Sequence, residues 1–239
     1  MNTVLLEHLL PRISFSVIWI CVALICVDIF FIAVFAVDEM LSFLDDGNRD
    51  RLGREWNIAY DWSYAEIFGY FKSILILGAL ISIPQVWKRP VYLAFVAIFV
   101  FVLLDDALEL HERFGAQIAT VLGLRSFGGL RAQDPGEVLV WIMAGIPLLG
   151  AAALAIARAP KEDRRNGVLL TAGLALLALF AVVADMAHEV LQNAFRGAND
   201  LFTLIEDGGE QITLSLICGL AILIHHEVRG RVRGRSGPV

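Results

Sequence analysis

The chain has 239 residues, of which 58% are hydrophobic and only 18% are charged, and its mean hydropathy is +0.70. This balance argues against a soluble globular domain and is typical of an integral membrane protein. The formal net charge of −6, with no basic stripe outside an arginine-rich C-terminus, argues against a nucleic-acid partner.

Six segments are apolar and long enough to span a bilayer, which takes about 20 helical residues. In chain order they cover residues 13–37, 67–87, 90–110, 138–159, 168–187 and 201–224. The first lacks a convincing signal-peptide cleavage site and is kept as a span. Since open sheets cannot satisfy their backbone groups in lipid, we predict an all-α fold, a six-transmembrane-helix bundle forming one domain over residues 1–239.

The distribution of lysine and arginine orients the predicted bundle. The side that holds both termini carries eleven of them: Arg12, Lys88, Arg89, Arg158, Lys161, Arg164, Arg165, Arg229, Arg231, Arg233 and Arg235. The other side carries seven: Arg49, Arg51, Arg54, Arg113, Arg125, Arg131 and Arg196. By the positive-inside rule, this excess predicts that both termini are cytoplasmic, and we expect a bacterial inner membrane as the location.

The segments between and after the spans have distinct compositions. Residues 38–66 mix charges with Trp56, Tyr60 and Trp62, which predicts an interfacial loop at the headgroup layer. The polar stretch 115–137 is expected to cover part of the same face. Residues 225–239 form a basic cytoplasmic tail, which we expect to lie near anionic membrane lipid.

Three of the spans are short unless clusters of acids and histidines enter the membrane with them. Residues 90–104 precede a cluster at 105–112, and residues 168–184 precede a cluster at 185–189. Residues 212–224 follow a cluster at 206–210 and rise only about 20 Å as a helix. Carboxylates in a bilayer usually face the bundle interior and indicate a functional site. All three clusters fall on the non-cytoplasmic side.

Helical geometry tests whether each cluster presents one face. Asp185, His188 and Glu189 share one arc, and so do Glu206, Asp207 and Glu210. In a continuous helix, Asp105, Glu109 and Glu112 would stack at i, i+4 and i+7. His111 lies off that stripe, so it predicts either a helix break or a separate role.

Carboxylate oxygen and imidazole nitrogen together suit divalent cations of intermediate hardness. Soluble four-helix di-metal carboxylate proteins combine the same groups, including a Glu-x-x-His pair, and Asp185 and His188 have that spacing. We therefore predict a metal site, without distinguishing iron, zinc or manganese. The predicted ligands are Asp105, Glu109, His111, Glu112, Asp185, His188, Glu206 and Glu210, with Glu189 and Asp207 as general-base or supporting groups.

Plainer explanations compete with the metal site. The charges can lie at the membrane interface on tilted helices. They can also pair internally: Lys72 could neutralise Asp28 or Asp105, and Arg113 could neutralise Asp106 or Asp207. Separately, Gly208 and Gly209 predict either a close helix contact or, as we favour, a local distortion of the last helix.

The favoured function is thus an integral membrane metal-binding protein whose site opens to the outer side. Its activity as an enzyme is left open, and a lipid or another amphiphile would be the substrate. The first alternative is a non-catalytic subunit or assembly factor that docks a protein partner in a membrane complex. The second is a cation or proton transporter, against which the apolar inner halves of the spans argue.

Overall fold

The computed structural model describes residues 15–45, 51–191 and 199–235. Parts of three predicted segments lie outside these ranges, namely the start of the first span, residues 46–50 of the interfacial loop and the end of the basic tail. Within the described ranges the chain is all-helical and has no strand beyond an isolated bridge between Phe127 and Leu130. The all-α prediction is confirmed for this part.

The helices follow one another along the chain with short connections. Their bounds are α2 Phe15–Leu44, α3 Tyr64–Ile81, α4 Pro90–Leu108, α5 Leu110–Leu122, α6 Asp134–Arg158, α7 Lys161–Ala178, the π-helical segment η3 Leu179–Ala184, α8 Asp185–Leu191 and α9 Asn199–Arg235, with 3₁₀ turns η1 Arg54–Trp56 and η2 Val86–Lys88. Six stretches of the described chain are long and apolar enough to cross a membrane, counting α7, η3 and α8 as one. These six apolar helices are compatible with a membrane protein.

Helix ends differ from the predicted spans because hydropathy marks only the apolar part of a helix. The second span was predicted to reach residue 87, but α3 ends at Ile81. Pro84 follows closely, and a proline disfavours helical conformation in the residue before it. By contrast, α9 continues to Arg235, so the basic tail is helical as far as that residue.

The third predicted span is broken where a continuous helix was expected. Glu109 adopts a left-handed conformation (φ 51°), which ends α4 and begins α5 in a new direction. The carboxylate of Asp105 accepts a hydrogen bond from the backbone N–H of His111 (3.0 Å) in the first turn of α5. The predicted stripe of Asp105, Glu109 and Glu112 is therefore wrong, and the helix break that His111 suggested is confirmed.

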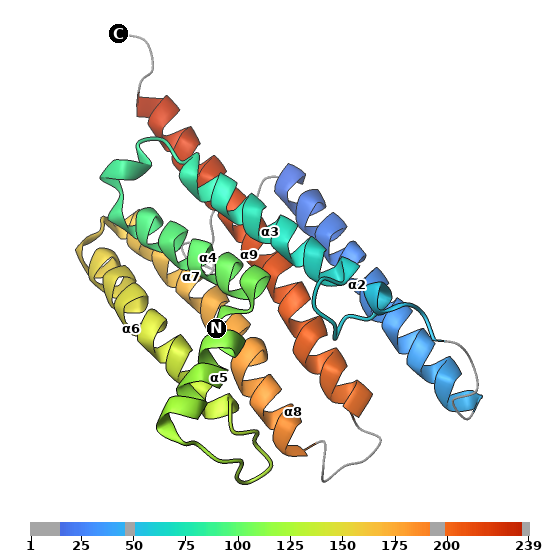
Figure 1. The fold of residues 1–239 in the computed structure, drawn as a ribbon. Coiled ribbons are helices and arrows are strands. Elements are labelled where there is room, and N and C mark those ends of the chain that lie inside the picture. The colour runs from blue at the N-terminus through green and yellow to red at the C-terminus, as the bar shows by residue number, and fades with distance from the viewer. Residues whose placement is uncertain (1–14, 46–50, 192–198, 236–239) are drawn as a thin grey trace, which may run out of the picture.

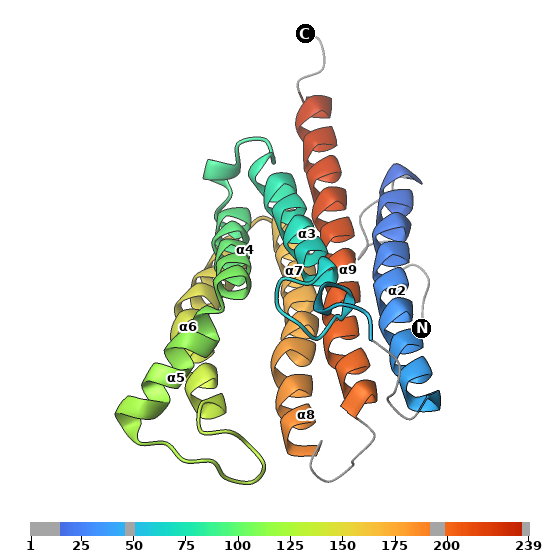
Figure 2. The same cartoon turned by 45° about the vertical axis from the view of Figure 1, so that its right-hand side comes forward.

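Helix α9 forms the centre of the bundle. It packs against α2, α3 and α7, while α4 packs against α3 and α6. Figure 1 shows the long helices running side by side, and Figure 2 shows α2 at one flank and α5 with α6 at the other. The elements that close the far flank, α5 and α6, thus lie across the bundle from α2.

The main hydrophobic core lies between α3, α4, α7 and α9. Its fully buried side chains include Ile76, Tyr92, Phe95, Phe99 and Ile217. Large apolar side chains on α2, such as Trp19, Ile29 and Phe30, are instead exposed on the outside of the bundle. An apolar exterior around a packed interior is the pattern of a helix bundle that lipid surrounds.

Candidate functional site

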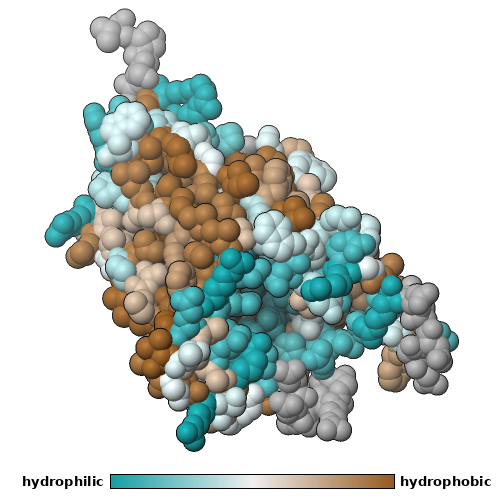
Figure 3. All heavy atoms as spheres, viewed as in Figure 1, coloured by the Kyte–Doolittle hydropathy of each residue, from teal (hydrophilic) through white to brown (hydrophobic). Residues whose placement is uncertain are grey.

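A polar cavity of about 280 Å³ lies between α3, α4, α6, η3 and α9, with the loop around residues 58–61 as part of its wall. Figure 3 shows the hollowed face of the molecule, where hydrophilic residues surround the depression and hydrophobic residues cover the surface beside it. Apolar side chains such as Val102, Leu174 and Leu177 close the deeper wall. The cavity is therefore polar on some walls and apolar on others.

The lining of this cavity is strongly acidic. Ten carboxylates line it: Asp61, Glu66, Asp105, Asp106, Glu112, Glu137, Asp185, Glu206, Asp207 and Glu210. Arg131 and His111 are the basic side chains among the described lining residues. Even with both protonated, the cavity wall carries a large excess of negative charge when the acids are ionised.

Seven of the ten predicted site residues line this cavity: Asp105, His111, Glu112, Asp185, Glu206, Asp207 and Glu210. They come from helices that are far apart in the sequence, as predicted from their common side of the bundle. The structure thus shows that these residues surround one cavity, while their role as metal ligands stays a prediction.

The other three predicted residues are engaged next to the cavity. Glu109 is the left-handed residue between α4 and α5 and pairs with Arg113 (3.4 Å). The imidazole of His188 contacts Glu206 through Nδ1 (2.7 Å) and Asn199 through Nε2 (2.9 Å). Glu189 lies 3.5 Å from Arg131. These contacts hold the three side chains next to residues that line the cavity, but not in the lining itself.

His111 and Asp105 form a close pair in the cavity wall. Nδ1 of the imidazole lies 2.8 Å from an Asp105 carboxylate oxygen, and the Asp105 side chain is only 1% exposed. Burial is the largest influence on the pKa of His111 and disfavours its charged form. The hydrogen bond to Asp105 and the negative charges of Asp105, Glu137 and Glu112 outweigh it, so the pKa lies above its ordinary value.

Four half-buried lining carboxylates have no hydrogen-bond or ion-pair partner within the described ranges. Asp106, Asp185, Asp207 and Glu210 are half-buried, and no hydrogen bond or ion pair from a protein donor reaches their side chains. Half-buried carboxylates usually gain such a partner, because removing them from water is costly. These four carboxylates therefore face the cavity and not a protein hydrogen-bond donor.

Five charged lining side chains were not among the predicted site residues: Asp61, Glu66, Asp106, Arg131 and Glu137. Arg131 bonds through Nε to Asp134 (2.8 Å) at the start of α6, which fixes its position beside the acids. Glu137 enters the wall because α5 and α6 approach closely at two glycines. A Cβ on Gly136 would lie 2.3 Å from the Gly115 carbonyl oxygen. Gly115 and Gly136 in the polar stretch 115–137 were the available signal for that contact.

A buried ion pair adjoins the cavity. Lys72 and Asp28 are both fully buried, and Nζ of Lys72 lies 2.8 Å from Asp28 Oδ1. The same ammonium donates to the backbone and side-chain oxygens of Gln211 (2.7 and 2.8 Å), and Gln211 also lines the cavity. The predicted Lys72–Asp28 pairing is thus confirmed, whereas the pairing of Arg113 with Asp106 or Asp207 is wrong.

Gly208 and Gly209 serve a close helix contact, and the favoured distortion of the last helix is wrong. Helix α9 is continuous through both residues. A Cβ on Gly209 would lie 2.3 Å from the ring of Phe180 in η3, so only glycine allows η3 to approach α9 this closely. This contact brings Asp185, the residue after η3, beside the acids of α9.

Within the described residues, no group of three or more His, Cys, Asp or Glu side chains is already arranged to hold a metal ion. The carboxylates are spread over the cavity walls. A cation in the cavity would therefore contact several of them through water, or after rotation of their side chains.

Comparison with known proteins supplies a family but no activity. No curated protein and no solved structure matches the chain. The family model described as "Domain of unknown function (DUF8692)" matches residues 17–224, which include the whole cavity lining. The chain therefore belongs to the family of the domain of unknown function DUF8692.

Proposed function

We propose that this protein is an integral membrane protein that binds a divalent metal cation in its acidic cavity. The observation that carries the proposal is the ratio of ten lining carboxylates to one arginine and one histidine. In the proposed orientation both termini are cytoplasmic, and the cavity opens to the outer side of a bacterial inner membrane.

The electrostatic argument starts from the mutual repulsion of the carboxylates. Like charges close together in a medium of low dielectric constant repel strongly, and burial adds the cost of lost hydration. A divalent cation offsets both effects and is then the largest local charge in the site. Asp106, Asp185, Asp207 and Glu210, which no protein donor reaches within the described chain, gain most from such a cation.

The Asp105–His111 pair suits a metal ligand and its supporting group. A metal-bound histidine usually donates its second ring N–H to a carboxylate, which orients the ring. Here Nδ1 contacts Asp105, and His111 lines the cavity. We assign Nε2 of His111 as the nitrogen ligand. The remaining ligands would be carboxylates and water, a mixture that Mg²⁺ and Mn²⁺ accept more readily than the closed sites of structural zinc.

Catalysis at this cation is part of the proposal. A bound divalent cation acidifies coordinated water, which then needs a proton acceptor. Asp207 lines the cavity and is the carboxylate that we assign to this role, while Glu189 is assigned a supporting role through Arg131. A lipid or another amphiphile would be the substrate, since the walls combine acids with apolar side chains.

Cation transport is the weaker candidate. The Lys72–Asp28 pair beside Gln211 extends polar groups deeper than the cavity. Beyond it, however, α9 contributes Ile217, Ala221 and Ile224, all at most 1% exposed, to the hydrophobic core. A hydrated ion would have to cross this packed apolar layer.

The proposal is tested by metal binding to the purified protein in detergent. After chelator treatment, the wild type should bind Mn²⁺ in a calorimetric titration, and Asp207→Asn/Glu210→Gln should bind it at least about tenfold more weakly. Binding should also weaken as the pH falls from about 8 to 6, because protons compete for carboxylate and imidazole ligands.

The matched control removes two exposed acids elsewhere, in Glu55→Gln/Glu162→Gln, and should bind Mn²⁺ like the wild type. Thermal unfolding in chelator should show that Asp207→Asn/Glu210→Gln is at least as stable as the wild type, since the substitutions relieve repulsion. Equal affinity of the two double variants, or no binding by the wild type, would contradict a cation site in this cavity.

A further inference from the structure

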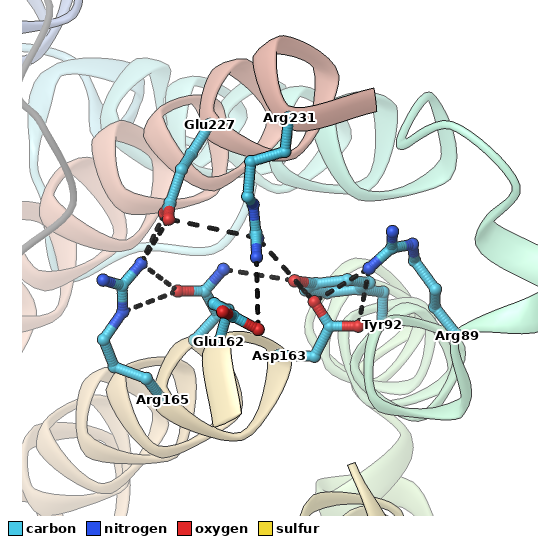
Figure 4. Close-up of polar contacts among 8 residues, drawn as sticks. Arg89, Tyr92, Glu162, Asp163, Arg165, Glu227 and Arg231 are labelled. Carbon is cyan, nitrogen blue, oxygen red and sulfur yellow. Dashed lines mark hydrogen bonds and ion pairs between the residues drawn. The ribbon is translucent and has the colours of Figure 1, made fainter. Parts of the chain in front are cut away.

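The end of the bundle opposite the cavity holds a network of polar side chains around the buried Tyr92, Asp163 and Asn166, shown in Figure 4. Nη1 of Arg89 donates to both oxygens of Asp163 (2.9 and 2.6 Å), and the Tyr92 hydroxyl donates to the same carboxylate (2.9 Å). Asn166 in turn donates to the Tyr92 oxygen (3.1 Å). Arg89, at the start of α4, is therefore held in one orientation.

The charges of this network balance. It joins three arginines and three acids, namely Arg89, Arg165, Arg231, Glu162, Asp163 and Glu227. Each acid lies within 4.0 Å of at least one of these guanidinium groups. The acids at this end are thus used by the network itself and do not neutralise the lysine and arginine side chains outside it.

A groove of about 620 Å³ runs beside the network, between the start of α4 and the end of α6. Lys88 and Arg158 line it, both are exposed, and neither forms an ion pair within the described chain. Arg89 also lines the groove. Only Nη1 of Arg89 bonds to Asp163, and Figure 4 shows its other terminal nitrogen pointing away from that carboxylate. Three cationic groups therefore border the groove, and one of them is held in place by buried partners.

Two further polar side chains line the groove, namely Gln85 and Asp163, whose carboxylate is already paired with Arg89. The other walls of the groove are apolar. Leu154 and Ala155 on α6 and Val91 on α4 line it, and Leu154 is 58% exposed. Trp87, in the turn η2 directly before Lys88, is 70% exposed. Tryptophan at the end of an apolar helix favours the headgroup layer of a bilayer. The groove thus combines cations at headgroup level with apolar side chains along the helices.

We infer that this groove binds one anionic phospholipid, with its phosphate between Lys88, Arg89 and Arg158 and an acyl chain along α6. Basic pockets between helices on the cytoplasmic side recognise anionic headgroups, and arginine pairs with phosphate through two parallel hydrogen bonds. A free phosphate would leave the apolar walls without a partner. The inference concerns the opposite end from the acidic cavity and is independent of cation binding there.

The test uses the full-length protein, stripped of lipid in detergent and examined by native mass spectrometry. The wild type is titrated with phosphatidylglycerol, with phosphatidylcholine of the same acyl chains, and with inorganic phosphate. We expect about tenfold tighter binding of phosphatidylglycerol than of phosphatidylcholine, and no retained phosphate. The preference should disappear in Lys88→Gln/Arg158→Gln.

The matched control is Lys161→Gln/Arg229→Gln, which removes two exposed cations from the same end but outside the groove. It should keep the preference for phosphatidylglycerol. The inference is overturned if the wild type shows no preference, if both double variants keep it, or if inorganic phosphate binds as tightly as the lipid. Equal thermal stability of the two double variants excludes misfolding as the cause of a loss.

Discussion

Lys72 on α3 forms hydrogen bonds to residues of both α2 and α9. Its ammonium makes three hydrogen bonds, to Asp28 and to two oxygens of Gln211. Asp28 also accepts a hydrogen bond from the hydroxyl of Ser215. Both charges are therefore fully partnered, and removing one partner leaves the other buried and unpaired.

Replacing Lys72 alone should destabilise the protein strongly. Lys72→Met leaves the Asp28 carboxylate in an apolar helix contact, and removing one partner of a buried pair typically costs about 3–5 kcal/mol. Asp28→Asn/Lys72→Met should recover much of this loss, because no charge then remains. Thermal unfolding in detergent, followed by circular dichroism, measures both.

Lys161→Met is the control for loss of a lysine, since Lys161 is exposed at the start of α7, and it should unfold like the wild type. If Lys72→Met unfolded at the wild-type temperature, the ion pair would not contribute to stability.

For single residues, the sequence predicts an ion pair when few oppositely charged residues lie at the same depth in the spans. A charge in the middle of a span, Asp28, needs a cation at similar depth, and Lys72 is the basic residue inside the second span. The partner of Arg113 is Glu109, which lies four residues earlier, the usual spacing of an ion pair along a helix. The sequence therefore contained the signal for this pair, although Asp106 and Asp207 were the expected partners.

Among the elements, the contact between α5 and α6 controls one wall of the cavity. The backbones meet where Gly115 faces Gly136, and a Cβ on Gly136 would lie 2.3 Å from a carbonyl oxygen. A backbone atom cannot move aside as a flexible side chain can. Glu137, the next residue along α6, depends on this approach for its place in the lining.

Gly136→Ala should therefore push α5 away from α6 and destabilise the protein by about 1–3 kcal/mol, the usual cost of overpacking. Gly145→Ala on the same helix is the control, because nothing lies within 4 Å of its added Cβ. Thermal unfolding of the two variants should differ clearly, with Gly145→Ala close to the wild type. Identical unfolding would show that the backbones can separate without cost.

The sequence predicted the number and order of the long helices because each span must be apolar over most of its length. It did not predict the π-helical segment η3, which the apolar run from Leu179 to Ala184 does not distinguish from an α-helix. It also left two interpretations of Gly208 and Gly209. The close approach of Phe180 to Gly209 shows that the glycines serve a helix contact and not a helix distortion. This contact could not be predicted, because the sequence does not say which helix packs against α9.

For the whole molecule, the two ends of the bundle differ in chemistry. Ten carboxylates line the cavity at one end, while lysine and arginine border the groove at the other. The positive-inside rule then predicts that the groove lies on the cytoplasmic side and the cavity on the outer side.

This orientation is tested by labelling single cysteines introduced into a variant that lacks Cys21, Cys26 and Cys218. A membrane-impermeant maleimide should label Asp61→Cys in intact bacterial cells, since Asp61 is exposed in the cavity wall. It should label Lys161→Cys only after the membrane is permeabilised. The opposite result would place the acidic cavity in the cytoplasm.

The candidate site was predictable to the extent that span lengths reveal it. Acid clusters next to short apolar runs identified Asp105, Asp185 and Asp207 and placed them on a common side. Asp61 belongs to a connecting segment, whose path over the helices is not encoded in any hydropathy pattern, and Glu137 lies in the first turn of α6. The contribution of Glu137 to the cavity depends on how closely α6 packs against α5.

The ion pair also constrains how the chain folds. Lys72 follows Asp28 by 44 residues, and Ser215 follows it by 187. The surroundings of the Asp28 carboxylate are therefore complete only when α9 has packed against α2 and α3, so the folding of an early helix depends on a late one.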